Sequence, residues 1–165
     1  MQINKLASGK ILLTLSYPIL IYLGLTYFQK EDHFFSFFVL FIPTIINLIL
    51  LSFFLKTLII PPSFAEKFAM FWVLNLSKEE ILYCRKVTKI WCIFFAFNGS
   101  IAAWLSLYGS LGAWTLYNGL IAYILIGTLF TFEFLYRHWR FRRYVGTVFD
   151  PLLSRLFPPS PTNEC

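Results

Sequence analysis

The segment YCRKVTKIWCIFFAFNGSIAAWLSLY, residues 83–108, decides the fold of this 165-residue chain. It opens with three basic residues, continues as an apolar run holding one asparagine, Asn98, and ends at a glycine- and serine-rich connection, residues 108–113. A second apolar run, 114–136, follows. A connection this short makes the two runs antiparallel neighbours. The segment therefore predicts a hairpin of two membrane spans, at 88–108 and 114–136.

The composition of the whole chain supports a membrane location. Hydrophobic residues make up 58% and charged residues only 13%, and the mean hydropathy is +0.69. A soluble domain of this length needs far more charge to cover its surface. The chain also has 20 phenylalanines and 9 tyrosines, which membrane proteins use in the apolar zone and at both interfaces. We expect an all-α integral membrane protein.

Two further apolar runs, 11–28 and 34–55, bring the predicted number of transmembrane helices to four, arranged as two hairpins. The first run has no small-x-small cleavage site after it, so we interpret it as a span and not as a signal peptide. Residues 1–157 then form a single membrane domain. The proline-rich tail, 158–165, is predicted to be disordered.

Between the second and third spans the sequence predicts a short helix on the cytoplasmic membrane surface. Pro61 and Pro62 end the preceding helix, and Ser63 with Glu66 has the spacing of a capping box. The helix is expected at 64–75, where few charges and one aromatic face favour an interfacial position.

A second capping box, Ser77 with Glu80, starts the next helix. No helix breaker follows before Gly99, so one helix is expected from Lys78 to about Tyr108, roughly 46 Å long.

Every lysine and arginine except Lys30 falls on one side of this topology. The positive-inside rule therefore places both termini and the middle segment in the cytoplasm. The basic residues beside the spans suit a bilayer with anionic headgroups, at about 1 kcal/mol each, and no nucleic-acid-binding motif accompanies them. The expected cytoplasmic basic surface consists of Arg85, Lys86, Lys89, Arg137, Arg140, Arg142 and Arg143.

Polar residues inside the spans are the candidate binding residues, because an unsatisfied amide in hydrocarbon costs several kcal/mol. Counting residues along the helices predicts a cluster of Asn47, Asn98 and Tyr123 that joins three spans. Glu133 has an i,i+4 partner in Arg137, and Lys89 or Arg85 is also within reach. Such groups serve either as helix–helix contacts or as a binding site. The full candidate set is Asn47, Asn98, Asn118, Tyr123 and Glu133.

No catalytic, metal or cofactor site is predicted. His33 and His138 fall on opposite sides of the membrane, and no Ser/His/Asp or Cys/His constellation is apparent. Cys84 and Cys92 are too far apart on one helix for a disulfide bond, and no metal-ligand spacing occurs. The residues argue weakly against an enzyme.

The motifs at 61–63, 83–102 and 114–133 resemble a family of small inner-membrane proteins from Gram-negative bacteria. These proteins are encoded among fatty-acid-synthase-like, aryl-polyene-type gene clusters and are sometimes labelled ketosynthases. The similarity covers about residues 60–143, with Ile60 where members often have arginine. It implies a bacterial inner-membrane location and a neighbourhood of acyl-carrier and acyl-chain enzymes. A ketosynthase itself needs a larger soluble fold, in which a cysteine nucleophile has histidine partners.

The resulting hypothesis is a non-catalytic membrane accessory that organises or recruits acyl-chain biosynthetic machinery. Its basic surface would attract an acidic acyl-carrier protein. One alternative is a transporter or flippase subunit for the acyl-lipid product, assembled as a homo- or hetero-oligomer. Another is a membrane enzyme acting on lipid-linked acyl groups, with polar residues converging around Tyr83, Arg85 and Glu133.

Overall fold

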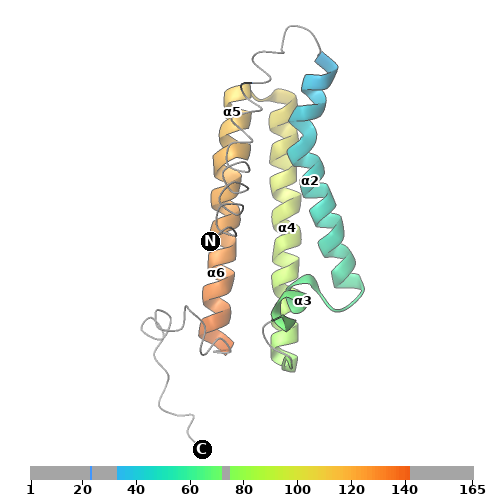
Figure 1. The fold of residues 1–165 in the computed structure, drawn as a ribbon, viewed down its shortest axis with the longest axis vertical. Helices are drawn as coiled ribbons and strands as arrows, with labels where there is room; N and C mark the ends of the chain where they lie inside the picture. The colour runs from blue at the N-terminus through green and yellow to red at the C-terminus, as the bar shows by residue number, and fades with distance from the viewer. Residues whose placement is uncertain (1–22, 24–32, 72–74, 142–165) are drawn as a thin grey trace, which may run out of the picture.

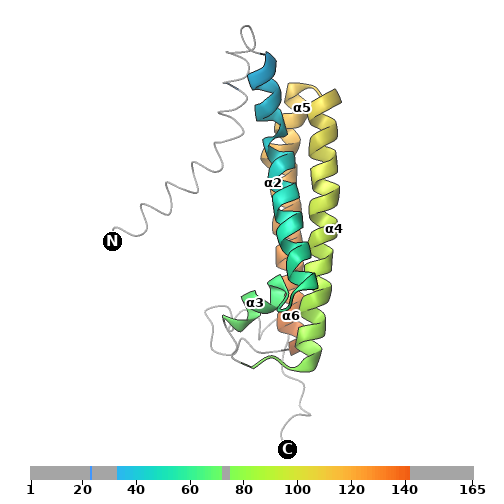
Figure 2. The same cartoon turned by 90° about the vertical axis from the view of Figure 1, so that its right-hand side faces the viewer.

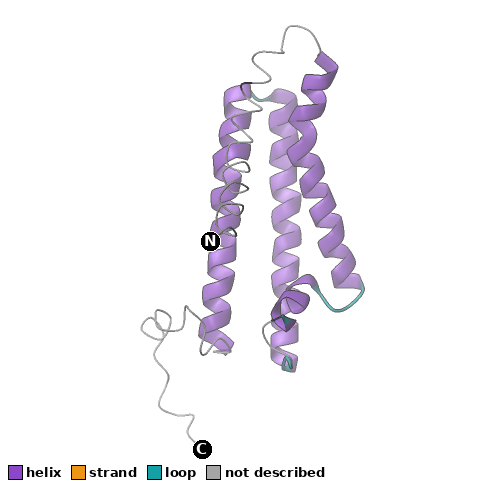
Figure 3. Cartoon of the chain, in the orientation of Figure 1, coloured by secondary structure: helices purple, strands orange, loops and turns teal. Residues whose placement is uncertain are grey.

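The computed structural model describes residues 23, 33–71 and 75–141. Within these ranges every regular element is a helix and no strand occurs (Figures 1 and 3). The elements are α2 (His33–Ile59), α3 (Phe64–Met70), α4 (Lys78–Tyr108), α5 (Leu111–Leu116), a π-helical turn (Tyr117–Ile121) and α6 (Ala122–Phe141). The last three run on without a break, so α5, the π turn and α6 form one continuous rod.

Within the described part of the chain three helices are long and apolar enough to cross a membrane: Phe37–Ile59, Lys78–Tyr108 and Leu111–Phe141. They agree with the second, third and fourth predicted spans. Helix α4 has its predicted limits, the first of the three continues to Ile59, past the predicted 55, and the last extends beyond 114–136 at both ends. The predicted first span, 11–28, and the predicted disordered tail, 158–165, lie outside the described residues.

Helix α4 begins and ends where the sequence predicts. The Ser77 side chain accepts a hydrogen bond from the Glu80 amide (3.3 Å), and the Glu80 carboxylate accepts one from the Ser77 amide (2.7 Å). This reciprocal pair forms the predicted capping box. At the other end the helix stops at Gly109, and Ser110 caps α5 by accepting from the Ala113 amide at 3.2 Å. The chain then returns antiparallel to α4 (Figure 2).

Helix α2 packs along α4 through aromatic contacts near one end and through hydrogen bonds near the other. Phe54 and Phe95 meet edge to face, with ring centroids 5.1 Å apart. Near the opposite end of α2, Pro43 supplies no amide proton to its own helix. There the Leu40 carbonyl accepts hydrogen bonds from Ser106 of α4 (2.7 Å) and Trp114 of α5 (3.0 Å). One turn of α2 is thereby tied to both other long helices.

Helix α3 differs from the prediction in its cap and its length. Ser63 does not cap with its side chain, and its hydroxyl instead donates to the Glu66 carboxylate at 2.6 Å. Two threonine hydroxyls accept from the first amides: Thr57 from Phe64 (3.1 Å) and Thr88 from Ala65 (3.2 Å). The predicted capping box is therefore wrong here, because α2 and α4 supply the acceptors.

The predicted C-terminal limit of this helix, residue 75, is also wrong. The helix has only 7 residues and ends at Met70, where the Phe71 amide donates to the Phe68 carbonyl at 3.3 Å. Such an i−3 bond tightens a last turn.

Candidate functional site

Helix α3, the first turns of α4 and the last turns of α6 meet at one end of the molecule, which we call the basic end (Figure 1). The cations Arg85, Lys86 and Lys89 are exposed on α4, and Arg140 is exposed on α6. The sequence-predicted basic surface thus lies largely here. Arg142 and Arg143 fall outside the described residues.

Arg137 was expected on this surface, but it is buried and 7% exposed. Its Nε donates to the Glu133 carboxylate at 2.7 Å, one helical turn away, as the i,i+4 spacing allows. Its Nη1 reaches the Cys84 thiol at 3.6 Å, and its guanidinium lies 5.5 Å from the centre of the Tyr83 ring. The arginine is buried because a carboxylate and an aromatic face replace its water.

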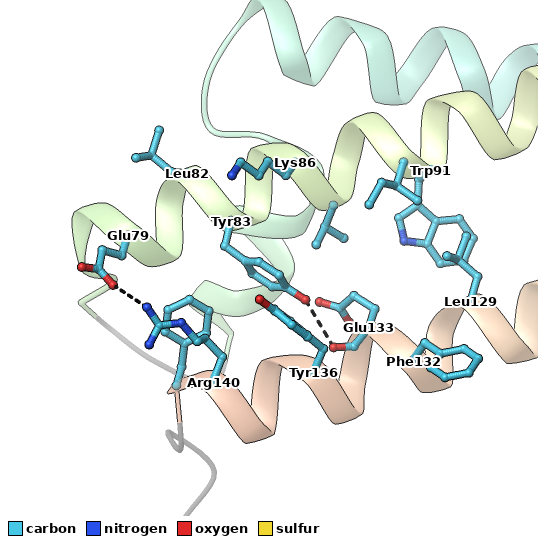
Figure 4. A pocket seen from close by; sticks show the side chains of 13 residues that line it. Glu79, Leu82, Tyr83, Lys86, Trp91, Leu129, Phe132, Glu133, Tyr136 and Arg140 are labelled. Atoms are coloured by element: carbon cyan, nitrogen blue, oxygen red, sulfur yellow. Dashed lines mark hydrogen bonds and ion pairs between the residues drawn. The ribbon is translucent and has the colours of Figure 1, made fainter.

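The basic end contains a groove between α4 and α6 with a volume of about 550 Å³. This volume is typical of small-molecule sites. Two of its lining residues, Tyr83 of α4 and Tyr136 of α6, stack their rings with centroids 5.4 Å apart. The Tyr83 hydroxyl donates to the Glu133 backbone carbonyl at 3.4 Å (Figure 4). These bulky side chains bridge the two helices and keep them apart.

The lining of this groove changes from polar to apolar along its length. Its α4 wall runs from Glu79 to Trp91, which at 1.5 Å per residue is about 18 Å. Glu79 and Arg140 lie at one end and pair at 3.6 Å, and Lys86 lies about halfway along the α4 wall, one turn before Ile90 (Figure 4). The apolar end is lined by Ile90, Trp91, Leu129 and Phe132.

A second groove of about 360 Å³ is lined by residues of α2, α3, α4 and α6. Its walls are mainly aromatic and aliphatic, and include Phe54, Phe68 and Phe130. Glu133 lines both grooves. The buried ion pair of Glu133 and Arg137 thus lies between the two grooves. Because the two charges neutralise each other, the pair presents little net charge to either groove.

The predicted polar cluster inside the membrane exists in altered form. Asn98 donates to the Asn47 side-chain carbonyl at 3.1 Å, and both side chains are buried. The third member is Tyr117, whose hydroxyl donates to the Asn98 side-chain oxygen, Oδ1, at 2.8 Å. Tyr123, the predicted third member, is 39% exposed. Counting residues gives height along a helix but not the face that a residue occupies, and Tyr117 shares its face with the buried Trp114.

The remaining predicted residues do not converge. Asn118 donates to the Trp114 carbonyl of its own helix at 3.0 Å. Neither groove is lined by Asn98 or Asn118. Arg85 donates to the Leu58 carbonyl of α2 at 3.4 Å, away from the groove that Tyr83 and Glu133 line. The constellation of Tyr83, Arg85 and Glu133 that a membrane enzyme would need is therefore not assembled.

In the part of the chain that the structure describes, no three His, Cys, Asp or Glu residues gather in a group that could hold a metal ion. Cys84 and Cys92 are free and buried on α4.

Comparison with known proteins finds no match: no family model, no curated protein and no solved structure resembles the chain closely enough to assign a family or fold. Inference about function therefore depends on the geometry of the basic end.

Proposed function

We propose that the chain is a four-span protein of a bacterial inner membrane and a non-catalytic accessory to acyl-chain biosynthesis. In this proposal residues 11–28 form the first span, helix α3 lies at the cytoplasmic interface, and both termini are cytoplasmic. The basic end faces the cytosol and recruits an acidic acyl-carrier protein or its enzymes. The association with aryl-polyene-type lipid biosynthesis depends on the sequence resemblance alone.

The observation that carries the proposal is the exposure of Arg85, Lys86 and Lys89 on the first turns of α4. These cations lie near the start of α4, which is one of the three helices apolar enough to span a membrane. Charge in this position is retained on the cytoplasmic side and steers acidic partners toward the surface. The hydroxyls of Thr57 on α2 and Thr88 on α4 accept hydrogen bonds from the first amides of α3. These bonds hold α3 in a fixed position next to the α4 turns that carry the cations.

Recruitment can be measured as retention of purified acyl-carrier protein on liposomes of phosphatidylcholine that contain the full chain. The double variant Arg85→Gln/Lys89→Gln is expected to lower retention severalfold at low salt, because exposed cations act mainly on encounter rate. Raising the ionic strength toward 1 M should lower retention by the wild type in the same way, since screening then acts within about 3 Å.

The matched control is Lys56→Gln/Lys67→Gln, which removes two exposed cations from α2 and α3 instead. It should retain carrier protein nearly as wild type. Equal retention by all three proteins contradicts the recruitment model.

A further inference from the structure

The groove between α4 and α6 has the polarity of an amphiphile. Over about 18 Å its lining passes from Glu79 and Arg140 at one end, through Lys86 near the middle, to Ile90 and Leu129 at the other. A lipid at a membrane interface has the same sequence of groups along its length, with a charged head followed by an acyl chain. The stacked rings of Tyr83 and Tyr136 line the groove beside Glu133 of the buried ion pair.

The net charge of the groove lining determines the sign of the headgroup that the groove can bind. Lys86 has no ion-pair partner within the described residues. Among the described residues Arg140 forms its ion pair with Glu79, at 3.6 Å, and both side chains are largely exposed. An exposed pair of this kind contributes little, so Arg140 can exchange Glu79 for another anion. Because Arg137 neutralises Glu133 and Glu79 pairs with Arg140, the groove lining keeps one positive charge in excess, that of Lys86.

From this arrangement we propose that the groove binds one anionic phospholipid of the bilayer. Its headgroup phosphate lies between Lys86 and Arg140, and one acyl chain lies along Ile90, Leu129 and Phe132. Arginine and lysine are the side chains that proteins use for phosphate. The inference depends on the membrane embedding of the proposed function but not on carrier-protein recruitment.

Native mass spectrometry of the full chain in mild detergent tests this site. Phosphatidylglycerol and phosphatidylcholine with the same acyl chains are titrated in parallel. We expect one phosphatidylglycerol to be retained in preference to phosphatidylcholine. Lys86→Gln/Arg140→Gln should reduce that preference by about fivefold for each cation removed. Glu79→Gln should strengthen retention, because it removes the anion that competes with phosphate for Arg140.

A matched pair on α4 tests the apolar end. Ile90 lines the groove and is 49% exposed, whereas Ile93 is 70% exposed and does not line it. Ile90→Trp should therefore fill the groove and abolish retention, while Ile93→Trp leaves it unchanged. Both positions are exposed, so neither substitution threatens folding.

Several outcomes overturn the proposal. They are equal retention of the two lipids, retention that survives Ile90→Trp, and replacement of the lipid adduct by a dimer of the chain that Ile90→Trp disrupts. Arg85→Gln/Lys89→Gln should leave lipid retention intact. Loss of carrier recruitment in that variant with lipid retention preserved separates the two proposals.

Discussion

The contact between α2 and α4 and the contact between α4 and α6 use similar aromatic and aliphatic residues but differ in closeness. Where α2 meets α4, Gly99 lies against Asn47, and a methyl group added to that glycine would stand 3.0 Å from the Asn47 Cβ. Where α4 meets α6 at the basic end, the contacting side chains are large, with Tyr83 stacked on Tyr136. Both grooves have walls from α4 and α6.

The difference shows what closes a helix interface in lipid. Lipid tails are as apolar as leucine, so the hydrophobic effect does not press two spanning helices together. Small residues and interhelical hydrogen bonds do so between α2 and α4. Between α4 and α6 the aromatic side chains act as spacers, and the polar links are the Tyr83 hydroxyl donating to the Glu133 backbone carbonyl and Arg137 donating to the Cys84 thiol.

The largest expected effect comes from the ion pair beside the open interface. Arg137→Met leaves the Glu133 carboxylate without its cation, and the two side chains are only 9% and 15% exposed. Removing one partner of such a pair costs about 3–5 kcal/mol. We expect a clear fall in the thermal unfolding midpoint in detergent, followed by circular dichroism.

Two controls accompany this variant. Glu133→Gln/Arg137→Met removes both charges and should recover most of the lost stability. Arg140→Met removes an exposed arginine of the same helix and should change stability by less than about 1 kcal/mol. If Arg137→Met unfolds at the same temperature as the wild type, the ion pair does not hold α6 in place.

The second effect contrasts two glycines and should differ in sign. Gly99→Ala forces a methyl group against Asn47, and overpacking of this kind costs about 1–3 kcal/mol. Gly127→Ala on α6 meets nothing within 4 Å, so it should stabilise the helix by about 0.5–1 kcal/mol. The measurement is the unfolding midpoint in a titration with sodium dodecyl sulfate. Equal shifts for the two variants would show that the contact of α2 with α4 is no tighter than the surroundings of α6.

Sequence reasoning succeeded where the determining contacts are local. The limits of α4 follow from the capping box of Ser77 and Glu80 at its start and from Gly109 at its end. Each of these signals lies within a few residues of the limit that it sets. The i,i+4 pair of Glu133 and Arg137 is local as well. The length and hydropathy of three helices similarly follow from composition over a short window.

Sequence reasoning failed where a partner comes from another helix. The cap of α3 is supplied by Thr57 and Thr88, which no local pattern identifies. The burial of Arg137 depends on the Tyr83 ring and the Cys84 thiol across the interface. A basic cluster beside a span predicts exposed charge. The available signal that Arg137 is buried was its acidic partner one turn away on the same helix, Glu133. The grooves depend on side-chain size at the contact of α4 with α6 and had no signal in the sequence.

The smallest expected effect distinguishes the observed polar cluster from the predicted one. Tyr117→Phe removes only the hydroxyl that donates to Asn98 at 2.8 Å. Interhelical hydrogen bonds in membranes contribute about 0.6 kcal/mol on average and up to about 1.7, so we expect a loss near 1 kcal/mol in the dodecyl sulfate titration. Tyr123→Phe is the matched control, because that ring is 39% exposed, and its shift should stay within about 0.5 kcal/mol. A larger loss of stability from Tyr123→Phe than from Tyr117→Phe would favour the predicted cluster, in which Tyr123 is the third member. From the structure we expect the larger loss from Tyr117→Phe, because Tyr117 follows the buried Trp114 by three residues and therefore faces α4.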